Sequence, residues 1–177
     1  MIGGVRQLLA RLTGTAALPA DFAGALEPDE QVLAAARGRS GPVVATHLGL
    51  WLGRRRIGWH LISRASWDGR ALTFVESEEA VRAEGAVLLR DHRPQKLPLT
   101  EAGQLPEVVQ KRVNGSIRTR HHRELPSGGA WFVQRKVPGR DGIVLQVRPD
   151  EGADEAEVAA YAEKVAREIE RRTGGEH

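Results

Sequence analysis

The 177-residue chain has no cysteine, and only 5% of its residues are aromatic. Without cysteine it forms no disulfide and no metal site built on thiolates, which fits a reducing compartment. Because aromatic side chains are so few, we expect the four tryptophans to be used in the core rather than in a binding face. The composition is otherwise that of an ordinary globular domain.

Long apolar runs are also missing. No stretch approaches the roughly 18 apolar residues that a membrane-spanning helix needs. The N-terminus is apolar and basic, but Arg6, Gln7 and Arg11 interrupt the continuous apolar region of a secretory signal. We therefore expect a cytoplasmic protein.

Lysine is scarce, since the only four are Lys96, Lys111, Lys136 and Lys164 among 26 basic residues, and this arginine bias is typical of a GC-rich genome. The net charge of +3 is unevenly distributed. Residues 150–177 hold nine acidic and four basic residues, net −5, so residues 1–149 carry +8. The basic part either faces an anionic partner or is a solvated surface balanced by an acidic last helix.

Apolar residues from Gln31 to Leu99 alternate with a period of two, which predicts strands. The predicted strands cover residues 31–36, 43–52, 57–67, 72–74, 86–90 and 96–99. Asp68-Gly69 is a typical tight hairpin turn. We expect an antiparallel meander that forms a small barrel or a strongly bent sheet.

The sequence pattern of the second half of the chain predicts a helix, further strands and a last helix. The helix starts near Pro106 and ends at Asn114-Gly115 or shortly after. Strand patterns return at residues 117–125, 131–137 and 143–147. Asp154 begins a C-terminal amphipathic helix, whose stripe is Val158, Tyr161, Ala162, Val165 and Ile169. The predicted fold class is α+β: an antiparallel barrel or bent sheet, then a helix, a strand pair and a C-terminal amphipathic helix.

The predicted organisation has two parts. Residues 1–28 form an N-terminal amphipathic helix, with Val5, Leu8, Leu9 and Leu12 at helical spacing, and a linker. Residues 29–177 form a single α+β domain. Within that domain, the barrel part covers about 29–100 and the part with the helices and later strands covers about 101–177.

One stretch resembles a known family. Glu30–Ala36, Val44–Leu52, Arg55–Trp59, Ala65–Asp68 and Ala71–Phe74 follow one another as strands do in bacterial pleckstrin-homology-like (PH-like) domains. The whole chain is similar in layout to uncharacterised actinobacterial proteins that join such a half to a helix, a strand pair and a final helix. The resemblance implies a fold that hosts lipid, peptide and protein binding, and it brings no catalytic residues.

No reactive constellation is evident, so we expect no enzyme, no cofactor and no metal site. His121 and His122 are neighbours and point to opposite faces of a strand, which prevents them from sharing one ion. His47 and His60 lie on neighbouring predicted strands without a nearby carboxylate. The serines lack the setting of a nucleophile, and we interpret Glu76, Glu78 and Glu79 as a solvated loop.

The strongest candidate site is a run of positive charge. The candidate polyanion-binding residues are Lys111, Arg112, Arg118, Arg120 and Arg123, with Arg54, Arg55 and Arg56 as an extension. Arginine pairs with phosphate through two parallel hydrogen bonds, so this run is typical of a nucleic-acid or anionic-lipid footprint. It is equally an ordinary solvated surface.

The sequence therefore predicts a non-enzymatic binding or scaffolding protein. A protein partner is the first interpretation. Nucleic-acid binding, to RNA or DNA through residues 111–123, is the alternative. Binding to an anionic membrane surface comes third.

Overall fold

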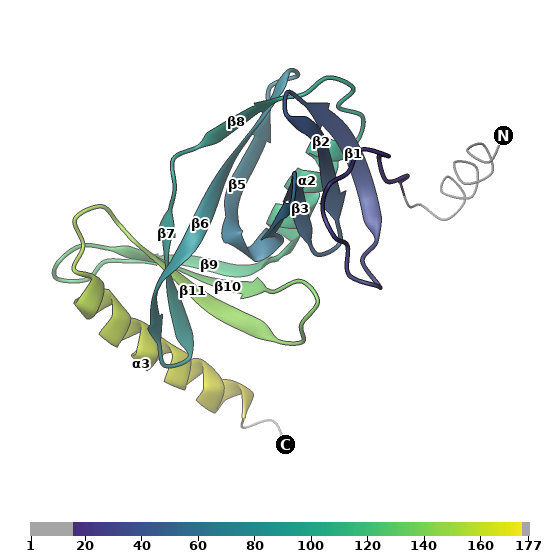
Figure 1. Ribbon diagram of the computed structural model, residues 1–177. Coiled ribbons are helices and arrows are strands. Elements are labelled where there is room, and N and C mark those ends of the chain that lie inside the picture. The colour runs from purple at the N-terminus through teal and green to yellow at the C-terminus, as the bar shows by residue number, and fades with distance from the viewer. Residues whose placement is uncertain (1–15, 175–177) are drawn as a thin grey trace. The chain divides into compact units, whose positions relative to one another are not determined.

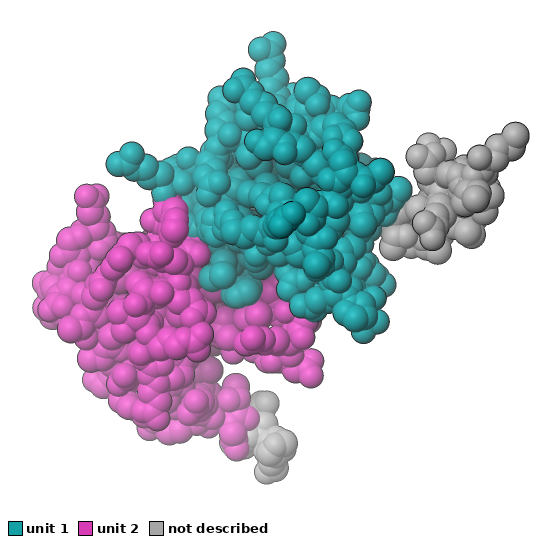
Figure 2. Space-filling view, in the orientation of Figure 1, with its two compact units in different colours: residues 1–76, 93–115 teal, residues 77–92, 116–177 magenta. Residues whose placement is uncertain are grey.

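The computed structural model describes residues 16–174, so the helix predicted before Thr13 lies outside the described residues (Figure 1). The chain forms two compact units, coloured separately in Figure 2. Unit 1 contains the chain up to Glu76 and residues 93–115, and unit 2 contains residues 77–92 and 116–177. One long strand, β6 (Ala71–Ala83), begins in unit 1 and continues into unit 2.

Unit 1 contains most of the strands. Its elements besides the start of β6 are β1 (Val32–Gly38), β2 (Gly41–Thr46), β3 (Gly49–Leu52), β4 (Arg55–Gly58), the 3-10 helix η1 (Trp59–Leu61), β5 (Ile62–Trp67), β8 (Gln95–Pro98) and α2 (Leu105–Gly115). The first four strands form one antiparallel sheet in sequence order, and β6 pairs antiparallel with both β5 and β8. The strands of unit 1 pair antiparallel as predicted, whereas the predicted strand at residues 86–90 lies in unit 2 and also pairs in parallel with residues 145–147.

The strands of unit 1 enclose one core that α2 helps to fill. Leu105, Val109 and Val113 of this helix are buried together with core residues such as Leu50 and Phe74. These helix positions recur at a spacing of four, so one face of α2 packs on the sheet. The helix ends at Gly115, as the Asn114-Gly115 pair indicated.

A smaller cluster forms on the other face of the first sheet. Val44 and Trp51 pack there with Phe22 and Leu26, and the rings of Phe22 and Trp51 meet edge to face at 5.4 Å. The segment before β1 therefore covers apolar surface that the strands leave on this side. In the stretch predicted as a linker, Phe22 and Leu26 are thus half-buried.

The prediction of one strand over residues 43–52 is wrong, because two strands and a tight turn occupy this range. Oγ1 of Thr46 accepts hydrogen bonds from the backbone N–H groups of Leu48 and Gly49, which closes the turn. The turn places Val44 in the smaller cluster and Leu50 in the main core, whereas a single strand would put these two even-numbered positions on one face.

Two further local predictions are corrected. The alternation from Ile57 to Leu61 is not one strand, because β4 ends at Gly58 and η1 follows. There the buried Trp59 donates its indole N–H to the carbonyl of Thr46, 3.0 Å away. The acidic run at residues 76–79 is not a loop, because it lies within β6 and pairs with neighbouring strands.

Unit 2 is a sheet with one helix on it. Besides the end of β6, its elements are β7 (Ala86–Asp91), β9 (Ile117–Arg123), β10 (Ala130–Lys136), β11 (Ile143–Pro149) and α3 (Glu155–Thr173). β9, β10 and β11 match the three strand patterns expected after the helix, so the strand pair of the predicted layout is in fact three strands. β9, β10 and β11 are antiparallel, whereas β11 pairs parallel with β7, so the sheet is mixed.

The last helix forms as predicted. Asp154 caps it by accepting a hydrogen bond from the N–H of Ala156 at 3.0 Å. Glu157, three residues after the cap, accepts a hydrogen bond from the N–H of Ser127 at 3.1 Å. The predicted apolar stripe packs on β7, β10 and β11, with Val158 and Ala162 fully buried. The α+β class is therefore confirmed. None of the described helices has the length and apolarity needed to cross a membrane.

Candidate functional site

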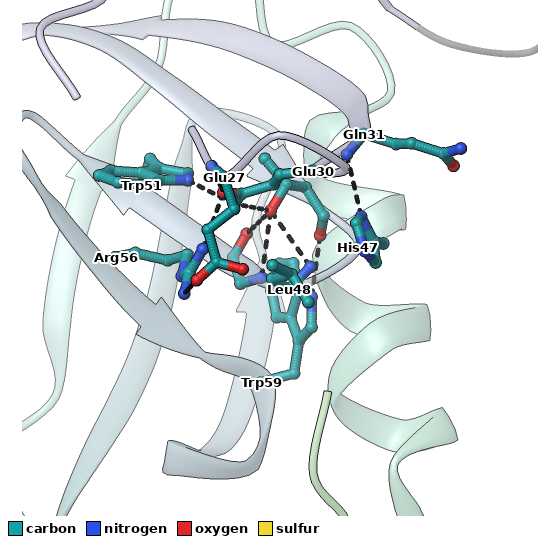
Figure 3. Close-up of polar contacts among 10 residues, drawn as sticks. Glu27, Glu30, Gln31, His47, Leu48, Trp51, Arg56 and Trp59 are labelled. Carbon is teal, nitrogen blue, oxygen red and sulfur yellow. Dashed lines mark hydrogen bonds and ion pairs between the residues drawn. The ribbon is translucent and has the colours of Figure 1, made fainter. Parts of the chain in front are cut away.

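The most strongly connected polar group in unit 1 is the carboxylate of Glu30 (Figure 3). Oε1 accepts hydrogen bonds from the Thr46 hydroxyl at 2.6 Å and the Trp51 indole N–H at 2.8 Å. Oε2 accepts from the N–H of Glu27 at 3.0 Å and from Nη1 of Arg56 at 2.8 Å. The side chain of Glu30 has no exposed surface.

These contacts keep Glu30 ionised. Burial by itself raises the pKa of a carboxyl group, because it disfavours the charged form. The hydrogen bonds from Thr46, Glu27 and Trp51 and the positive charge of Arg56 outweigh burial, so the pKa of Glu30 lies below its ordinary value. Each oxygen is already taken by two donors, which makes this carboxylate a structural anchor rather than a base that could accept a substrate proton.

The two histidines of unit 1 lie in different kinds of element. Nδ1 of His47 accepts the N–H of Gln31 at 2.9 Å (Figure 3). His60 lies in η1 and not in a strand, so the two histidines do not face each other across paired strands. Instead, this hydrogen bond joins His47 to Gln31, the residue directly before β1.

The three consecutive arginines 54–56 are not an uncommitted basic patch. Arg56 bonds to Glu30 and also to Glu27, at 2.8 and 3.0 Å. Arg55 forms an ion pair with Glu76. Among the described residues, Arg54 has no carboxylate within 4 Å. Two of these three charges are therefore compensated within unit 1.

The basic run from residue 111 to residue 123 is divided between elements. Lys111 and Arg112 belong to α2 of unit 1, and Lys111 forms an ion pair with Glu107 at 3.0 Å. Arg118, Arg120 and Arg123 belong to β9 of unit 2. The register between β9 and β10 shifts beside Arg118, so alternation does not determine which face this residue occupies.

β9 presents different groups on its two faces. The guanidinium of Arg120 lies 4.3 Å from the ring centre of Trp131, and His122 meets the same ring at 5.1 Å. On the other face, His121 and Arg123 line a hollow of about 190 Å³ beside α3, with Phe132 and Tyr161 as its apolar part. The structure brings Arg120 onto an aromatic ring, and no sequence motif indicated this pairing.

A shallow groove of about 540 Å³ lies at one end of unit 1. The turn between β1 and β2, residues 38–43, forms one wall, and residues 96–98 of β8 form another. Leu52 and Gly53 complete the lining. The surface is mainly apolar, and Arg39 and Lys96 are its only charged lining residues among those described. Sequence reasoning missed this groove because its walls lie more than 40 residues apart.

Sequence reasoning also missed two arginines in unit 2, of which Arg135 is buried and Arg148 is half-buried. Arg135 has no exposed surface and donates from Nε to Ser116 at 2.6 Å. Burial and the neighbouring charge of Arg148 lower the pKa of Arg135 to about 10. Arg148 donates to Asp91 at 3.1 Å. The signal was available, because Arg135 shares the strand alternation of buried Val133 and Val137.

Comparison with known proteins does not assign the chain to a family. No family model, no curated sequence and no solved structure matches this chain. The geometry described above is therefore the basis of the functional argument.

Proposed function

We propose that this chain is a non-enzymatic binding protein that docks a segment of another protein in the groove of unit 1. The observation that carries the proposal is the lining of that groove. Leu52, Leu97 and Pro98 offer apolar contact, and Arg39 and Lys96 add positive charge. Such a surface suits an extended segment with apolar side chains and at least one acidic side chain.

The proposed fold family of unit 1 is PH-like. Two features support this proposal: antiparallel strands that curl around one core, and a single helix, α2, packed on that core after the last strand. A PH-like domain ends in this way. In this proposal residues 77–92 are an insertion between two strands of the PH-like domain. The protein belongs to the actinobacterial proteins that it resembles, and it acts in the cytoplasm.

The proposal is tested with variants that change the groove. Tagged protein is cross-linked in its own host, purified, and compared by mass spectrometry with two variants. Ser40→Trp fills the groove from an exposed turn, and Leu97→Asp places a charge on its apolar wall. The control is Leu18→Asp, which makes the same change at an exposed leucine outside the groove.

We expect a partner that the parent and Leu18→Asp retain and that both groove variants lose by at least tenfold. Because the contact is mainly apolar, capture should persist at high salt concentration. Equal recovery with the parent and both groove variants would contradict the proposal.

A second candidate is nucleic-acid binding through β9. The specific observation in its favour is the stacking of Arg120 on Trp131, because an arginine on an aromatic ring is a surface on which bases stack. Arg118 and Arg123 are exposed on the same strand. Phosphate contacts would supply most of the affinity.

Salt dependence separates the two candidates. Fluorescence anisotropy with labelled RNA, labelled DNA and anionic vesicles is measured at several salt concentrations. Each phosphate contact on duplex DNA contributes about 0.9 to the slope of log affinity against log salt. Arg118→Ala with Arg120→Ala should lower that slope by roughly one to two. The control double variant, Arg167→Ala with Arg171→Ala, removes the same charge from α3 and should leave the slope unchanged.

A further inference from the structure

Three side chains with metal-binding atoms converge at one end of the β9–β10–β11 sheet. Nε2 of His122 lies 2.7 Å from Oδ2 of Asp150, and Nδ1 lies 3.4 Å from Oε1 of Glu124. One ligand atom from each of the three residues can be chosen so that all lie within 4.8 Å of one another. All three residues belong to unit 2, so the cluster forms within one unit.

The register of the sheet explains why these residues meet. His122 in β9 lies opposite Trp131 in β10, and Trp131 lies opposite Arg148 in β11. Two residues after Arg148, the N–H of Asp150 donates to the carbonyl of Gly129 at 2.9 Å. His122 therefore belongs to β9 and Asp150 directly follows β11, so the two side chains approach each other from the two sides of β10.

Gly129 makes this approach possible. A methyl group at this position would lie 2.5 Å from Oδ2 of Asp150 and 2.6 Å from Nε2 of His122. No side chain fits in that space without displacing one of the two. Because Gly129 has no side chain, the imidazole of His122 and the carboxylate of Asp150 can meet directly before β10.

The chemistry of the cluster suits a divalent transition metal. Neutral imidazole nitrogen and carboxylate oxygen are both ligands of Zn²⁺ at about 2.0–2.2 Å, and three protein ligands leave a fourth position for water. The side chain of His122 is 28% exposed and that of Glu124 is 81% exposed, so an ion from solvent can enter. The edge-to-face contact with Trp131 holds the imidazole in place.

We propose that His122, Glu124 and Asp150 bind one Zn²⁺ ion or a similar transition-metal ion. One ring nitrogen of His122 and one oxygen of each carboxylate are the ligands. In the proposed site the exposed side chain of Glu124 reorients toward the ion. This departs from the expectation of no metal site, which rested on two pairs of histidines, His121 with His122 and His47 with His60. The structure gives His122 other partners, and it places His121 beside α3.

The experiment uses full-length protein that carries no histidine tag and has been dialysed against a chelator. Zn²⁺ is titrated by isothermal calorimetry, and Co²⁺ serves as a second probe through its visible absorption. Asp150→Asn and Glu124→Gln preserve side-chain shape, and Glu124→Gln alters an exposed position that folding does not need. His121→Ala is the matched control, because it removes a neighbouring histidine on the other face of the same strand.

We expect one ion per chain and a melting temperature that rises with Zn²⁺ concentration. Asp150→Asn and Glu124→Gln should each weaken binding at least tenfold, and His122→Ala should abolish it. His121→Ala should bind like the parent. Absence of binding by the parent at 100-fold molar excess of Zn²⁺ over protein, or equal weakening in His121→Ala, would overturn the proposal. So would unchanged affinity in Asp150→Asn and Glu124→Gln.

Discussion

Nη1 of Arg56 lies 2.8 Å from Oε2 of Glu30, a carboxylate with no exposed surface. This pair joins the segment before β1 to the fourth strand across 26 residues of chain. A buried carboxylate that keeps its charge must be well compensated, because an unpaired buried charge is costly. Four donors to its two oxygens compensate the buried charge of Glu30.

Glu30→Gln should lower the free energy of unfolding by about 1–3 kcal/mol. An amide has the same shape as the carboxylate but only one accepting oxygen. Its NH2 group would face either Thr46 and Trp51 or the N–H of Glu27 and Arg56, and most of these groups are donors. Urea denaturation of both proteins at neutral pH measures the difference. Equal midpoints and slopes would show that the buried charge contributes nothing.

The same pair predicts a pH dependence. Because the pKa of Glu30 is lowered in the folded state, its contribution is fully present above the ordinary glutamate pKa of about 4.3. The contribution is lost as pH falls through the lower, folded value. We therefore expect the difference between parent and Glu30→Gln to be largest near neutral pH and to shrink in strong acid. A difference that stays constant from about pH 7 to about pH 3 would contradict this assignment.

Gly129→Ala should destabilise unit 2. The added methyl group would lie 2.5 Å from Asp150 and must push it or His122 aside. Overpacking of this kind costs about 1–3 kcal/mol. The control is Gly115→Ala, since nothing lies within 4 Å of a methyl group there. The control should be neutral or stabilising by up to about 1 kcal/mol, because alanine restricts the unfolded chain. Thermal melts that rank the two variants the other way would refute the crowding argument.

Val158→Asp should disrupt the docking of α3. Val158 has no exposed surface and belongs to the apolar cluster of unit 2. A carboxylate there would be buried without a partner, which costs several kcal/mol and is comparable with the stability of a whole domain. Ala160→Asp introduces the same group on the exposed face of the helix and should have a small effect. Circular dichroism melts compare the two, and similar melting temperatures would mean that the helix does not depend on this packing.

Local sequence patterns determined the elements of this protein. Alternation at residues 143–147, the helical spacing after Asp154 and the stop at Asn114-Gly115 each depend on neighbours a few residues apart. Such patterns reflect the geometry of a single strand or helix, and the α+β class follows from them. They failed between Thr46 and Gly49, because that turn is closed by a threonine side chain rather than by the usual Asn-Gly or Asp-Gly pair.

Tertiary structure alone decided which distant residues meet. Glu30 reaches Arg56, and His122 reaches Asp150 across 28 residues, only because strand pairing places them side by side. The sequence placed residues 111–123 on a helix and a following strand, but it did not show that Arg120 lies on Trp131 or that His121 and Arg123 lie beside α3. Charge, burial and hydrogen bonding depend on distances in space, and a linear pattern of residues fixes those distances only within one turn of helix or one step of a strand. Longer-range distances follow from register and packing.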